Sequence, residues 1–440
     1  MQRRVLGGLL PRIPCLQRYM STIGIGLSGG VDSSVAALLL KRSGHEVVGI
    51  HMQNWDALDE GNSETPGVCS QLQDVQDARK VANQLGIELI EVSFVKEYWH
   101  SVFQEVIDGY SDGITPNPDV LCNSFIKFGS FLEHAKHVVG VDGIATGHYA
   151  RFEPLQGDNT HSTPHDARTS MDRDKASEAG TMVLKRAVDH SKDQSYFLAM
   201  VAHASLMQCQ FPLGHLNKSQ VREIARIEGL ITAEKKDSMG LCFVGKRNFP
   251  SFLAQYVPPC PAILQDIVSG RVLGEHPNMT ALTIGQKAKL SGQPHAWFVA
   301  EKDMERQVVW CAPSPTHPSL YHSSATTTSF HWLCPNGSEG DAFRARYHHL
   351  PAEDQLSYKV RYRQALGQCH LQPVNADRAG KVQVHFTLPQ KSVTIGQTLV
   401  LYHSLGGKED ICLGGGPVQQ AGPSLYAQGV KETPPERWDD

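Results

Sequence analysis

The chain has 440 residues, of which 40% are hydrophobic and 20% charged, and its formal net charge is −4. No apolar run approaches the ~18–20 residues that a membrane-spanning helix needs, so we expect no membrane insertion, and at about 150 residues per domain the length predicts two to four domains. Because acidic residues slightly outnumber basic ones, local basic patches would have to hold any nucleic-acid partner.

The first twenty residues contain four arginines and no carboxylate, and the first acidic residue of the chain is Asp32. This composition is typical of a mitochondrial transit peptide, whereas a secretory signal has a longer uninterrupted apolar core. We therefore expect residues 1–20 to be a targeting segment and the protein to be mitochondrial. The alternative is the frayed N-terminus of a cytosolic protein.

Between residues 22 and 147, short apolar strands alternate with amphipathic helices. The expected strands are Thr22–Leu27, His45–Met52, Ile87–Val92 and Gly143–Gly147. Helical spacing of apolar residues covers Val35–Leu40, Gln71–Leu85, Lys96–Tyr110 and Phe125–Ala135. This alternation predicts an α/β doubly wound domain with a parallel sheet, which we assign to residues 21–193.

The rest of the chain changes character twice. Residues 154–180 are polar and poor in large apolar side chains, which predicts a disordered insertion between two hairpin strands, Ala150–Glu153 and Met182–Val188. Helical spacing continues to about residue 256, where a proline-rich boundary begins, and short β segments follow. We therefore predict a small mixed or helical central domain at 194–300 and a C-terminal β-barrel at 301–440.

A glycine- and serine-rich loop, Ser28–Ser34, lies between the first strand and the first helix. In that position the free amides and the positive dipole end of the helix can surround one anion, and Asp32 could hold Mg²⁺. The alternative is a tight turn in which a serine or aspartate caps the helix. No G-x-x-x-x-G-K-[ST] motif is present, which disfavours a Walker-type phosphotransferase.

This loop resembles the PP-loop of ATP pyrophosphatases, which cleave ATP between the α- and β-phosphates. The resemblance implies that ATP is bound at the loop and at the ends of two neighbouring strands. The implied ATP-binding residues are Gly26, Leu27, Ser28, Gly29, Gly30, Val31, Asp32, Ser33, Met52 and Gly147.

Two of the ten cysteines have surroundings that indicate chemistry. Cys122 lies near the start of an expected helix, where the helix dipole raises the thiolate fraction. Asp119, three residues earlier, can share its face, although a helix cap is the alternative role for this carboxylate. Cys242 stands among small and polar residues, which favours an exposed loop. For any other single cysteine, a buried reduced thiol is the expectation.

Eight motifs in a fixed order carry a more specific resemblance. They are S-G-G-V-D-S (28–33), N-P-D-V-L-C-N (117–123), T-G-H-Y-A-R (146–151), K-D-Q-S-Y-F (192–197), D-S-M-G-L-C-F (237–243), T-I-G-Q (283–286), K-V-R-Y-R-Q (359–364) and T-I-G-Q (394–397). Together they resemble the tRNA-specific 2-thiouridylases over nearly the whole chain after residue 22, and the N-terminus is similar to that of a mitochondrial form.

The resemblance implies an ATP-dependent sulfurtransferase that replaces O2 of the wobble uridine of tRNA with sulfur and releases AMP and pyrophosphate. It assigns Cys242 as the persulfide carrier, Cys122 as the other catalytic thiol and Asp119 as general acid or base. The implied cofactors are ATP, Mg²⁺ and persulfide sulfur. The implied partners are tRNA and a sulfur donor, either a cysteine desulfurase or a sulfur-relay protein.

For tRNA binding, Lys359–Arg363 alternates basic and apolar residues, so a strand there would present its three cations on one face. A solvated strand face is the alternative. The tRNA-binding residues that the resemblance implies are Asn117, Pro118, Asp119, His148, Lys192, Asp193, Gln194, Arg361, Tyr362 and Gln397.

Two other functions stay open at this point. The chain could be another PP-loop ligase, such as an ammonia-dependent synthetase, although such enzymes need no paired thiols. It could also be a non-catalytic tRNA-binding protein with an iron–sulfur cluster held by Asp119, Cys122 and Cys242. A brown, oxygen-sensitive protein would favour the cluster, whereas formation of AMP and pyrophosphate with tRNA would favour thiolation.

Overall fold

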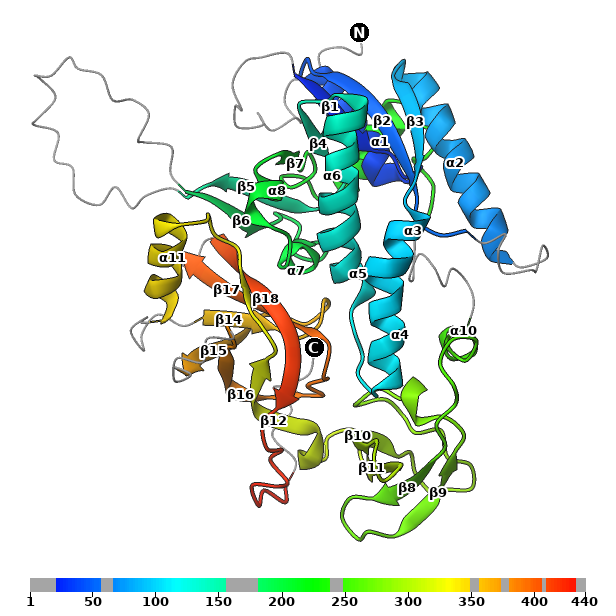
Figure 1. The fold of residues 1–440 in the computed structure, drawn as a ribbon, viewed down its shortest axis with the longest axis vertical. Coiled ribbons are helices and arrows are strands. Elements are labelled where there is room, and N and C mark those ends of the chain that lie inside the picture. Colours follow the sequence, from blue (N-terminus) through cyan, green and yellow to red (C-terminus); the bar gives the residue numbers. More distant parts are fainter. Residues whose placement is uncertain are drawn as a thin grey trace, which may run out of the picture.

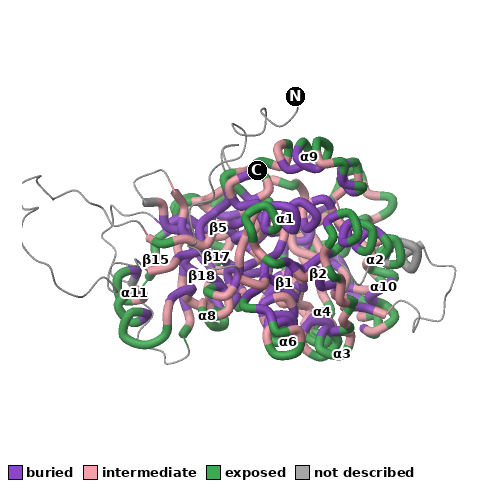
Figure 2. The backbone as a smooth tube through the Cα atoms, turned by 90° about the horizontal axis from the view of Figure 1, so that it is seen from above, coloured by how far each residue is buried: buried purple, intermediate pink, exposed green. Residues whose placement is uncertain are grey.

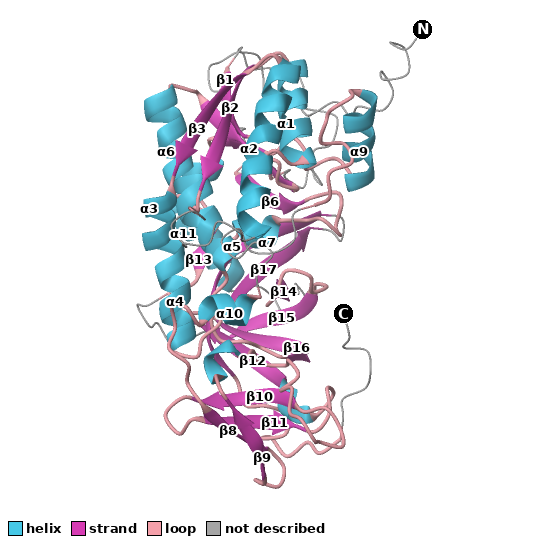
Figure 3. Cartoon of the chain, turned by 90° about the vertical axis from the view of Figure 1, so that its right-hand side faces the viewer, coloured by secondary structure: helices cyan, strands magenta, loops and turns pink. Residues whose placement is uncertain are grey.

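The computed structural model describes seven stretches of the chain. They are residues 21–56, 66–155, 181–237, 248–348, 356–372, 380–405 and 409–432. The expected targeting segment, nearly all of the expected insertion, and Cys242 lie outside these residues. The described chain forms an α/β unit, a six-stranded barrel and a small four-stranded sheet, which follow one another along the long axis of the molecule (Figures 1 and 3).

The α/β unit is built on a parallel sheet with the strand order β3-β2-β1-β4-β7. The strands are β1 (Thr22–Gly26), β2 (Glu46–Gln53), β3 (Glu88–Ser93), β4 (Gly143–Ala145) and β7 (Cys209–Gln210). The first four confirm the sequence prediction. The two-residue β7 is too short to leave a periodic pattern, and only its pairing with β4 identifies it.

Helices cover both faces of this sheet. They are α1 (Val31–Arg42), α2 (Pro66–Leu85), α3 (Val95–Tyr98), η3 (Trp99–Phe103), α4 (Gln104–Ser111), α5 (Pro118–Leu121), η4 (Cys122–Ser130), α6 (Phe131–His134) and η5 (Ala135–Val139). Two separate hydrophobic clusters form the core, one containing α1 and α2 and the other containing η3, α4 and α6. The doubly wound arrangement is therefore confirmed.

One continuous helix runs from α5 through η5. Its expected apolar face is correct at Phe128 and Phe131, which are buried, but Phe125 is 50% exposed and Ile126 takes the inward position. The π-helical turns of η4 explain the difference, because their wider spacing shifts which residues face the sheet.

The polypeptide after the insertion remains part of the α/β unit. Strands β5 (Ala150–Pro154) and β6 (Met182–Arg186) form the expected antiparallel pair, followed by α7 (Ser195–Leu198), α8 (His203–Leu206) and α9 (Lys218–Ile227). The apolar face of α9 is buried in the same cluster as α1. We therefore propose to extend the first domain through residue 237, beyond the expected boundary at 193, because α9 has no separate core of its own.

The central unit is β-rich. Helix α10 (Phe249–Leu253) precedes a sheet with the order β10-β11-β8-β9, whose strands are β8 (Ala262–Asp266), β9 (Val272–His276), β10 (Phe298–Asp303) and β11 (Val308–Ala312); η6 (Met279–Ala281) connects β9 to β10. The expected boundary at residue 300 falls inside β10, which pairs with β11. We propose a boundary after Ala312.

Six antiparallel strands form the predicted C-terminal barrel. Its strands are β12 (Tyr321–Thr327), β16 (Gln383–Lys391), β15 (Gly367–Gln372), β14 (Leu356–Lys359), β17 (Thr398–Leu405) and β18 (Glu409–Ala421), and η7 (Pro318–Leu320), β13 (His331–Trp332) and α11 (Ser338–His348) flank them. Pairing of β12 with β18 closes the ring. Strand β18 also pairs with β6, which joins the barrel to the α/β unit.

Burial follows this architecture. Figure 2 shows buried backbone along β1, β17 and β18 and exposed outer faces on α2, α6 and α9. Within the described residues, no helix combines the length and the apolar character needed to cross a bilayer.

Candidate active site

The glycine-rich loop connects β1 to the first turn of α1. Gly30 is the N-cap of α1 and supplies no side-chain cap, so the first amides of the helix face outward without a capping oxygen. The Oγ of Ser33 accepts a hydrogen bond from the amide of Ser28 at 3.2 Å, which folds the loop back onto the helix. Gly29 has φ +74°, and a Cβ there would lie 2.2 Å from the carbonyl oxygen of Asp74 in α2. The alternative of a side-chain-capped turn is therefore wrong, and the loop retains an anion-binding geometry.

Two lysines from later parts of the chain reach this loop, and each also pairs with two carboxylates; those of Lys235 are Asp74 and Asp77, at 2.7 and 2.6 Å. The Nζ of Lys218 lies 2.8 Å from Asp32 Oδ2 and 2.8 Å from Asp237 Oδ1. The Nζ of Lys235 donates to the carbonyl oxygen of Gly29 at 3.0 Å. Sequence reasoning missed both lysines, because they lie in ordinary polar stretches near α9 and only the packing of α9 on α1 brings them to the loop.

Asp32 is already engaged in this arrangement. Besides Lys218, the hydroxyl of Tyr149 donates to Asp32 Oδ1 at 2.7 Å. A magnesium ion on this carboxylate would have to displace the Lys218 ammonium, so the expected Mg²⁺ role of Asp32 does not fit this geometry. Within the described stretches, no cluster of three or more histidine, cysteine or acidic side chains forms a metal site.

The turn after β4 brings a second segment against the loop. A Cβ on Gly147 would lie 2.9 Å from the amide nitrogen of Ser33, so a larger residue would push the turn away. Met52, at the end of β2, lies near Gly26, where a Cβ would be 3.4 Å from the Met52 Cε. The predicted ATP-binding residues therefore meet at the carboxyl edge of β1, β2 and β4, where open α/β sheets bind ligands.

His148 links this turn to the helix that carries Cys122. Its Nδ1 lies 2.7 Å from the Oγ1 of Thr146, and its ring is 5.7 Å from that of Phe128. Burial lowers the pKa of His148 well below its ordinary value, and Lys127 lowers it further. His148 is therefore neutral at physiological pH.

The helix that carries Cys122 starts at Asn117. The Oδ1 of Asn117 accepts hydrogen bonds from the amides of Asp119 and Val120 at 3.2 and 3.3 Å. Asn117, not Asp119, is therefore the cap. The Asp119 carboxylate forms no hydrogen bond or ion pair with any residue that the structure describes, and it remains available for chemistry.

Burial raises the pKa of Asp119 above its ordinary value, and Lys127 opposes that shift. Cys122 begins the second helical turn and is 5% exposed within the core cluster. The helix of Cys122 and α1 pack on opposite faces of the sheet. They approach each other at its carboxyl edge, where His148 contacts Phe128 and the neighbouring Gly147 lies against Ser33 of the glycine-rich loop.

Cys242 lies outside the described residues, so its distance from Cys122 is not part of this geometry. The described chain before it ends beside the glycine-rich loop. Asp237 forms ion pairs with Lys218, Arg222 and Lys192 at 2.8, 2.8 and 3.1 Å. Although burial alone would raise the pKa of Asp237, Lys218 and Lys192 lower it to about 2.

The expected RNA contacts at 192–194 have different surroundings. Asp193 is buried and forms an ion pair with Arg186 at 3.0 Å. Gln194 Oε1 accepts a hydrogen bond from the amide of Tyr149 at 3.0 Å. Lys192 and Gln194 are both partly exposed, and the Lys192 side chain is 40% exposed. Asp193 thus holds this segment against the end of β6, and Gln194 holds it against the T-G-H-Y turn. Lys192 forms an ion pair with Asp237 at 3.1 Å.

The expected three-cation strand face at 359–363 is wrong. Strand β14 ends at Lys359, which is buried, and the next four residues form a turn. Arg361 is half-buried and Arg363 is exposed. The ring of Tyr362 packs 4.3 Å from that of Phe197 in the α/β unit. Basic and apolar residues do alternate as predicted. However, the strand ends at Lys359, so the three cations cannot lie on one strand face.

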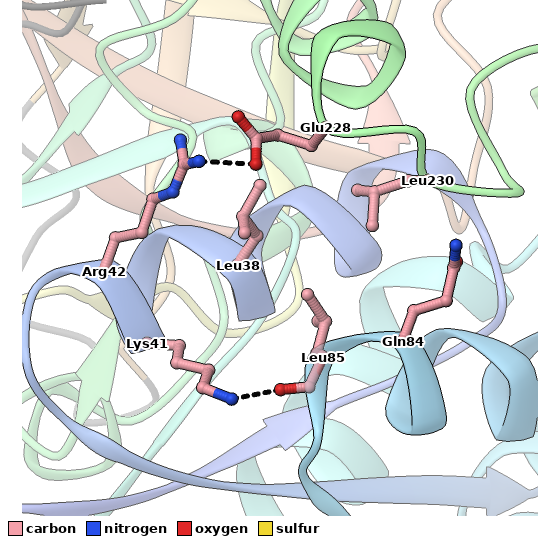
Figure 4. Close-up of a pocket in the computed structure, with 7 residues that line it drawn as sticks. All are labelled: Leu38, Lys41, Arg42, Gln84, Leu85, Glu228 and Leu230. Carbon is pink, nitrogen blue, oxygen red and sulfur yellow. Dashed lines mark hydrogen bonds and ion pairs between the residues drawn. The ribbon is translucent and has the colours of Figure 1, made fainter. Parts of the chain in front are cut away.

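A cavity of about 410 Å³ lies elsewhere on the α/β unit, between α1, α2 and α9 (Figure 4). Its rim includes Lys41 and Arg42, at the opposite end of α1 from the glycine-rich loop, and Glu228, which pairs with Arg42 at 2.5 Å. This cavity is therefore separate from the candidate active site.

Comparison with protein families gives three consecutive matches. Residues 21–246 match the family described as tRNA methyl transferase HUP domain, residues 250–313 the tRNA methyl transferase PRC-barrel domain, and residues 323–418 the aminomethyltransferase beta-barrel domain.

Two curated relatives are similar to this chain over more than nine tenths of its length. The chain is 39% identical over 414 residues to mitochondrial tRNA-specific 2-thiouridylase 1 of Gallus gallus, covering 92% of this chain and 93% of the relative. It is 41% identical over 413 residues to tRNA-specific 2-thiouridylase MnmA of Protochlamydia amoebophila, covering 93% and 96%.

Solved structures match more weakly. An NMN synthetase from Francisella tularensis is 18% identical, with a TM-score of 0.28, over 53% of this chain and 71% of that chain. A 4-thiouridine synthetase–RNA complex with bound ATP is 15% identical, with a TM-score of 0.25, over 54% of this chain and 50% of that chain. At these TM-scores, neither match supports an argument about the site.

Proposed function

The chain belongs to the tRNA-specific 2-thiouridylase family, and from this premise we propose that it uses ATP to replace O2 of the wobble uridine in tRNA with sulfur. The observation that carries the proposal is the T-G-H-Y turn, Thr146–Tyr149. This turn touches the glycine-rich loop through Gly147 and the helix of Cys122 through His148. Nucleotide activation and thiol chemistry can therefore share one site.

In the first step, the glycine-rich loop holds the phosphates of ATP. The uncapped amides of α1 and the ammonium groups of Lys218 and Lys235 stabilise negative charge there. The uracil O2 attacks the α-phosphorus and pyrophosphate leaves. The oxygen then belongs to a good leaving group, because it departs as part of AMP.

Sulfur enters in the second step as a persulfide on Cys242. Either its terminal sulfur attacks C2 directly, or the Cys122 thiolate first attacks the Cys242 sulfur and releases hydrosulfide, which then attacks. In the direct route AMP leaves C2, and the Cys122 thiolate then attacks the Cys242 sulfur and breaks its bond to the transferred sulfur, which stays on the uridine. In both routes oxidation of the two thiols to a Cys122–Cys242 disulfide supplies the two electrons that the persulfide sulfur gains. A reductant and a new persulfide from a donor protein must then restore the enzyme.

Asp119 is suited to moving protons near the base. Its pKa is raised by burial, so its carboxyl group holds a proton more readily than an exposed aspartate, and no described side chain binds it. We assign it as the general acid or base of the thiolation step, with Asn117 and Pro118 beside the target base. The target uridine must leave its stack to reach this helix.

We propose that Lys192, Arg361 and Tyr362 line the tRNA path outside the site, and that the protein acts in mitochondria. The arginine-bearing, acid-free residues 1–20 and the mitochondrial relative from Gallus gallus support that location, although bacterial relatives are equally similar.

The proposal is tested by Cys122→Ser and Cys242→Ser. Each variant should form no 2-thiouridine in tRNA incubated with ATP, Mg²⁺ and a persulfide source, as measured by mass spectrometry of tRNA nucleosides. ATP binding should persist in both variants, because neither thiol belongs to the loop. Cys260→Ser, at a half-buried thiol in the central unit, serves as the matched control and should retain activity. Normal 2-thiouridine formation by either catalytic variant would refute the assignment.

A further inference from the structure

The loop that leads into the Cys122 helix is held by the C-terminal barrel. The amide of Thr115 donates to the carbonyl oxygen of Ile395 at 3.0 Å, and the Nε2 of Gln397 donates to the carbonyl oxygen of Thr115 at 2.8 Å. Thr115 is buried, at 7% exposure. Both backbone polar groups of this buried residue are thus satisfied by the Thr394–Gln397 turn, which lies about 280 residues further along the chain.

This turn is fixed to the barrel wall. The amide of Gly396 donates to the carbonyl oxygen of Val418 in β18, and the amide of Val418 donates to the carbonyl oxygen of Gln397, both at 2.9 Å. Gly396 has φ +89°, and a Cβ there would lie 2.2 Å from the Cγ2 of Ile114. The backbone of the Thr394–Gln397 turn therefore packs directly against Ile114, with no room for a side chain at residue 396. This close packing restricts movement of the turn relative to the loop.

The contact continues to the cap of the helix. Asn117 follows Thr115 by two residues, and its Oδ1 caps the amides of Asp119 and Val120. The same side chain lies near the hydroxyl of Tyr196; burial raises the pKa of Tyr196, and Asn117 lowers it. That hydroxyl donates to the carbonyl oxygen of Thr398 at 2.9 Å. The barrel therefore contacts the surroundings of the Asn117 cap at two places, at Thr115 and at Tyr196.

We propose that the Thr394–Gln397 turn is a positioning element that fixes Asn117, and through it Asp119 and Cys122, for the chemical step. Gln397 is then a positioning residue that sets the rate of sulfur transfer, in place of the direct RNA contact that family resemblance implies. The part of this inference that concerns the rate of sulfur transfer rests on the proposed function. It makes the barrel a part of the catalytic machinery as well as a surface for tRNA.

The decisive variant is Gln397→Glu. It preserves the length of the side chain but removes the amide donor and turns a carboxylate oxygen towards the Thr115 carbonyl. The matched control is Gln428→Glu, because the Nε2 of Gln428 also donates to a backbone carbonyl oxygen, that of Pro423, at 2.8 Å on an exposed surface.

Two quantities separate the roles of Gln397. The single-turnover rate of thiolation at saturating tRNA should fall about tenfold in Gln397→Glu, the upper range for losing one hydrogen bond. The Kd for tRNA should stay within about twofold of the wild-type value, since a positioning contact binds no RNA. The control variant should match the wild type in both quantities. A raised Kd with a wild-type rate at saturation would make Gln397 an RNA contact and overturn the inference.

Hydrogen exchange tests the same inference without activity. In the protein alone, amides in the peptide 117–125 should exchange faster in Gln397→Glu than in the wild type or in Gln428→Glu, because the capped amides lose their fixed partner. Gly396→Ala, which pushes on Ile114, should produce the same change. Unchanged exchange in both variants would overturn the inference. If the wild-type protein formed no 2-thiouridine, the proposed function would fail, and the exchange result would still decide whether the barrel fixes the cap.

Discussion

At the residue scale, the two side chains that begin the Cys122 helix divide their tasks. Asn117 caps the helix, as its two hydrogen bonds to backbone amides show. Asp119 is therefore not needed to cap the helix, and its carboxyl group is partly buried, which raises its pKa. A partly buried carboxyl group without a partner among the described residues costs folding free energy when it ionises, and such groups are common among catalytic acids and bases.

Asp119→Asn should therefore stabilise the protein near neutral pH. Burial raises the pKa of Asp119 in the folded state, so the ionised form is less favourable there than in the unfolded chain. The destabilisation that this causes grows as pH rises through the folded-state pKa, and it vanishes below the ordinary aspartate pKa of about 4. The difference in unfolding free energy between the Asp119→Asn variant and the wild-type protein should consequently shrink as pH is lowered from neutral towards about 4.

Urea denaturation across this pH range measures the difference. Asp112→Asn, at an exposed aspartate at the end of α4, controls for the loss of one charge and should show no such trend. A stabilisation of Asp119→Asn that stays constant over the whole range, or a destabilisation at neutral pH, would contradict the expected sign.

At the element scale, one buried ion pair connects three elements. Asp193 precedes α7, Arg186 ends β6, and Arg186 also pairs with Asp410 of β18 at 2.8 Å. Asp193 further accepts hydrogen bonds from the amides of Ala187 and Ser195 at 3.1 and 3.2 Å. This carboxylate therefore joins the hairpin, α7 and the barrel, and its contribution is to the fold rather than to direct RNA contact.

Asp193→Asn should lower the unfolding free energy by about 3 kcal/mol, because removal of one partner leaves a buried charge incompletely compensated. Urea denaturation followed by tryptophan fluorescence measures the loss. Glu91→Gln provides the comparison, since the pair of Glu91 with Arg79 is exposed to solvent and should contribute little. Equal stabilities of the two variants would show that burial does not strengthen the Asp193 pair.

At the scale of the whole molecule, all three units meet at the loop before α5. Thr115 contacts the barrel, and Gly113 abuts Met304 in the central unit, where a Cβ would lie 2.5 Å from the Met304 sulfur. Figure 1 shows the start of α5 directed towards the other two units. If tRNA binds the barrel, as we propose, this contact places it close to the helix that carries Cys122.

Neutralising Arg361 and Arg363 together should weaken tRNA binding and flatten its salt dependence. Each lost phosphate contact lowers the slope of log K against log salt by about 0.7–0.9. Lys359→Met should leave the slope unchanged, because Lys359 is buried and its Nζ donates to the carbonyl oxygen of Tyr362. Filter binding over a salt series measures both slopes. An unchanged slope for the double arginine variant would remove this turn from the RNA surface.

The sequence alone determined the features that depend on local order. The sequence predicted the alternation of strands and helices, the glycine-rich loop before α1, the β5–β6 pair and the barrel. These features follow from hydrophobic periodicity, turn residues and the spacing of strands, which can be read from the sequence. The motifs around Cys122 and Cys242 identified the family, because the order of motifs can be recognised from the sequence without a structure.

Only the tertiary structure decided which distant residues share the site. Lys218 and Lys235 reach the loop because α9 packs on α1, and Gln397 reaches Thr115 because the barrel docks against the α/β unit. It also showed that Lys359 is buried and that Arg361 lies in a turn, which no alternation of residue types reveals. The physical reason is that long-range contacts depend on the summed packing of whole elements, whereas sequence patterns report only on neighbours along the chain.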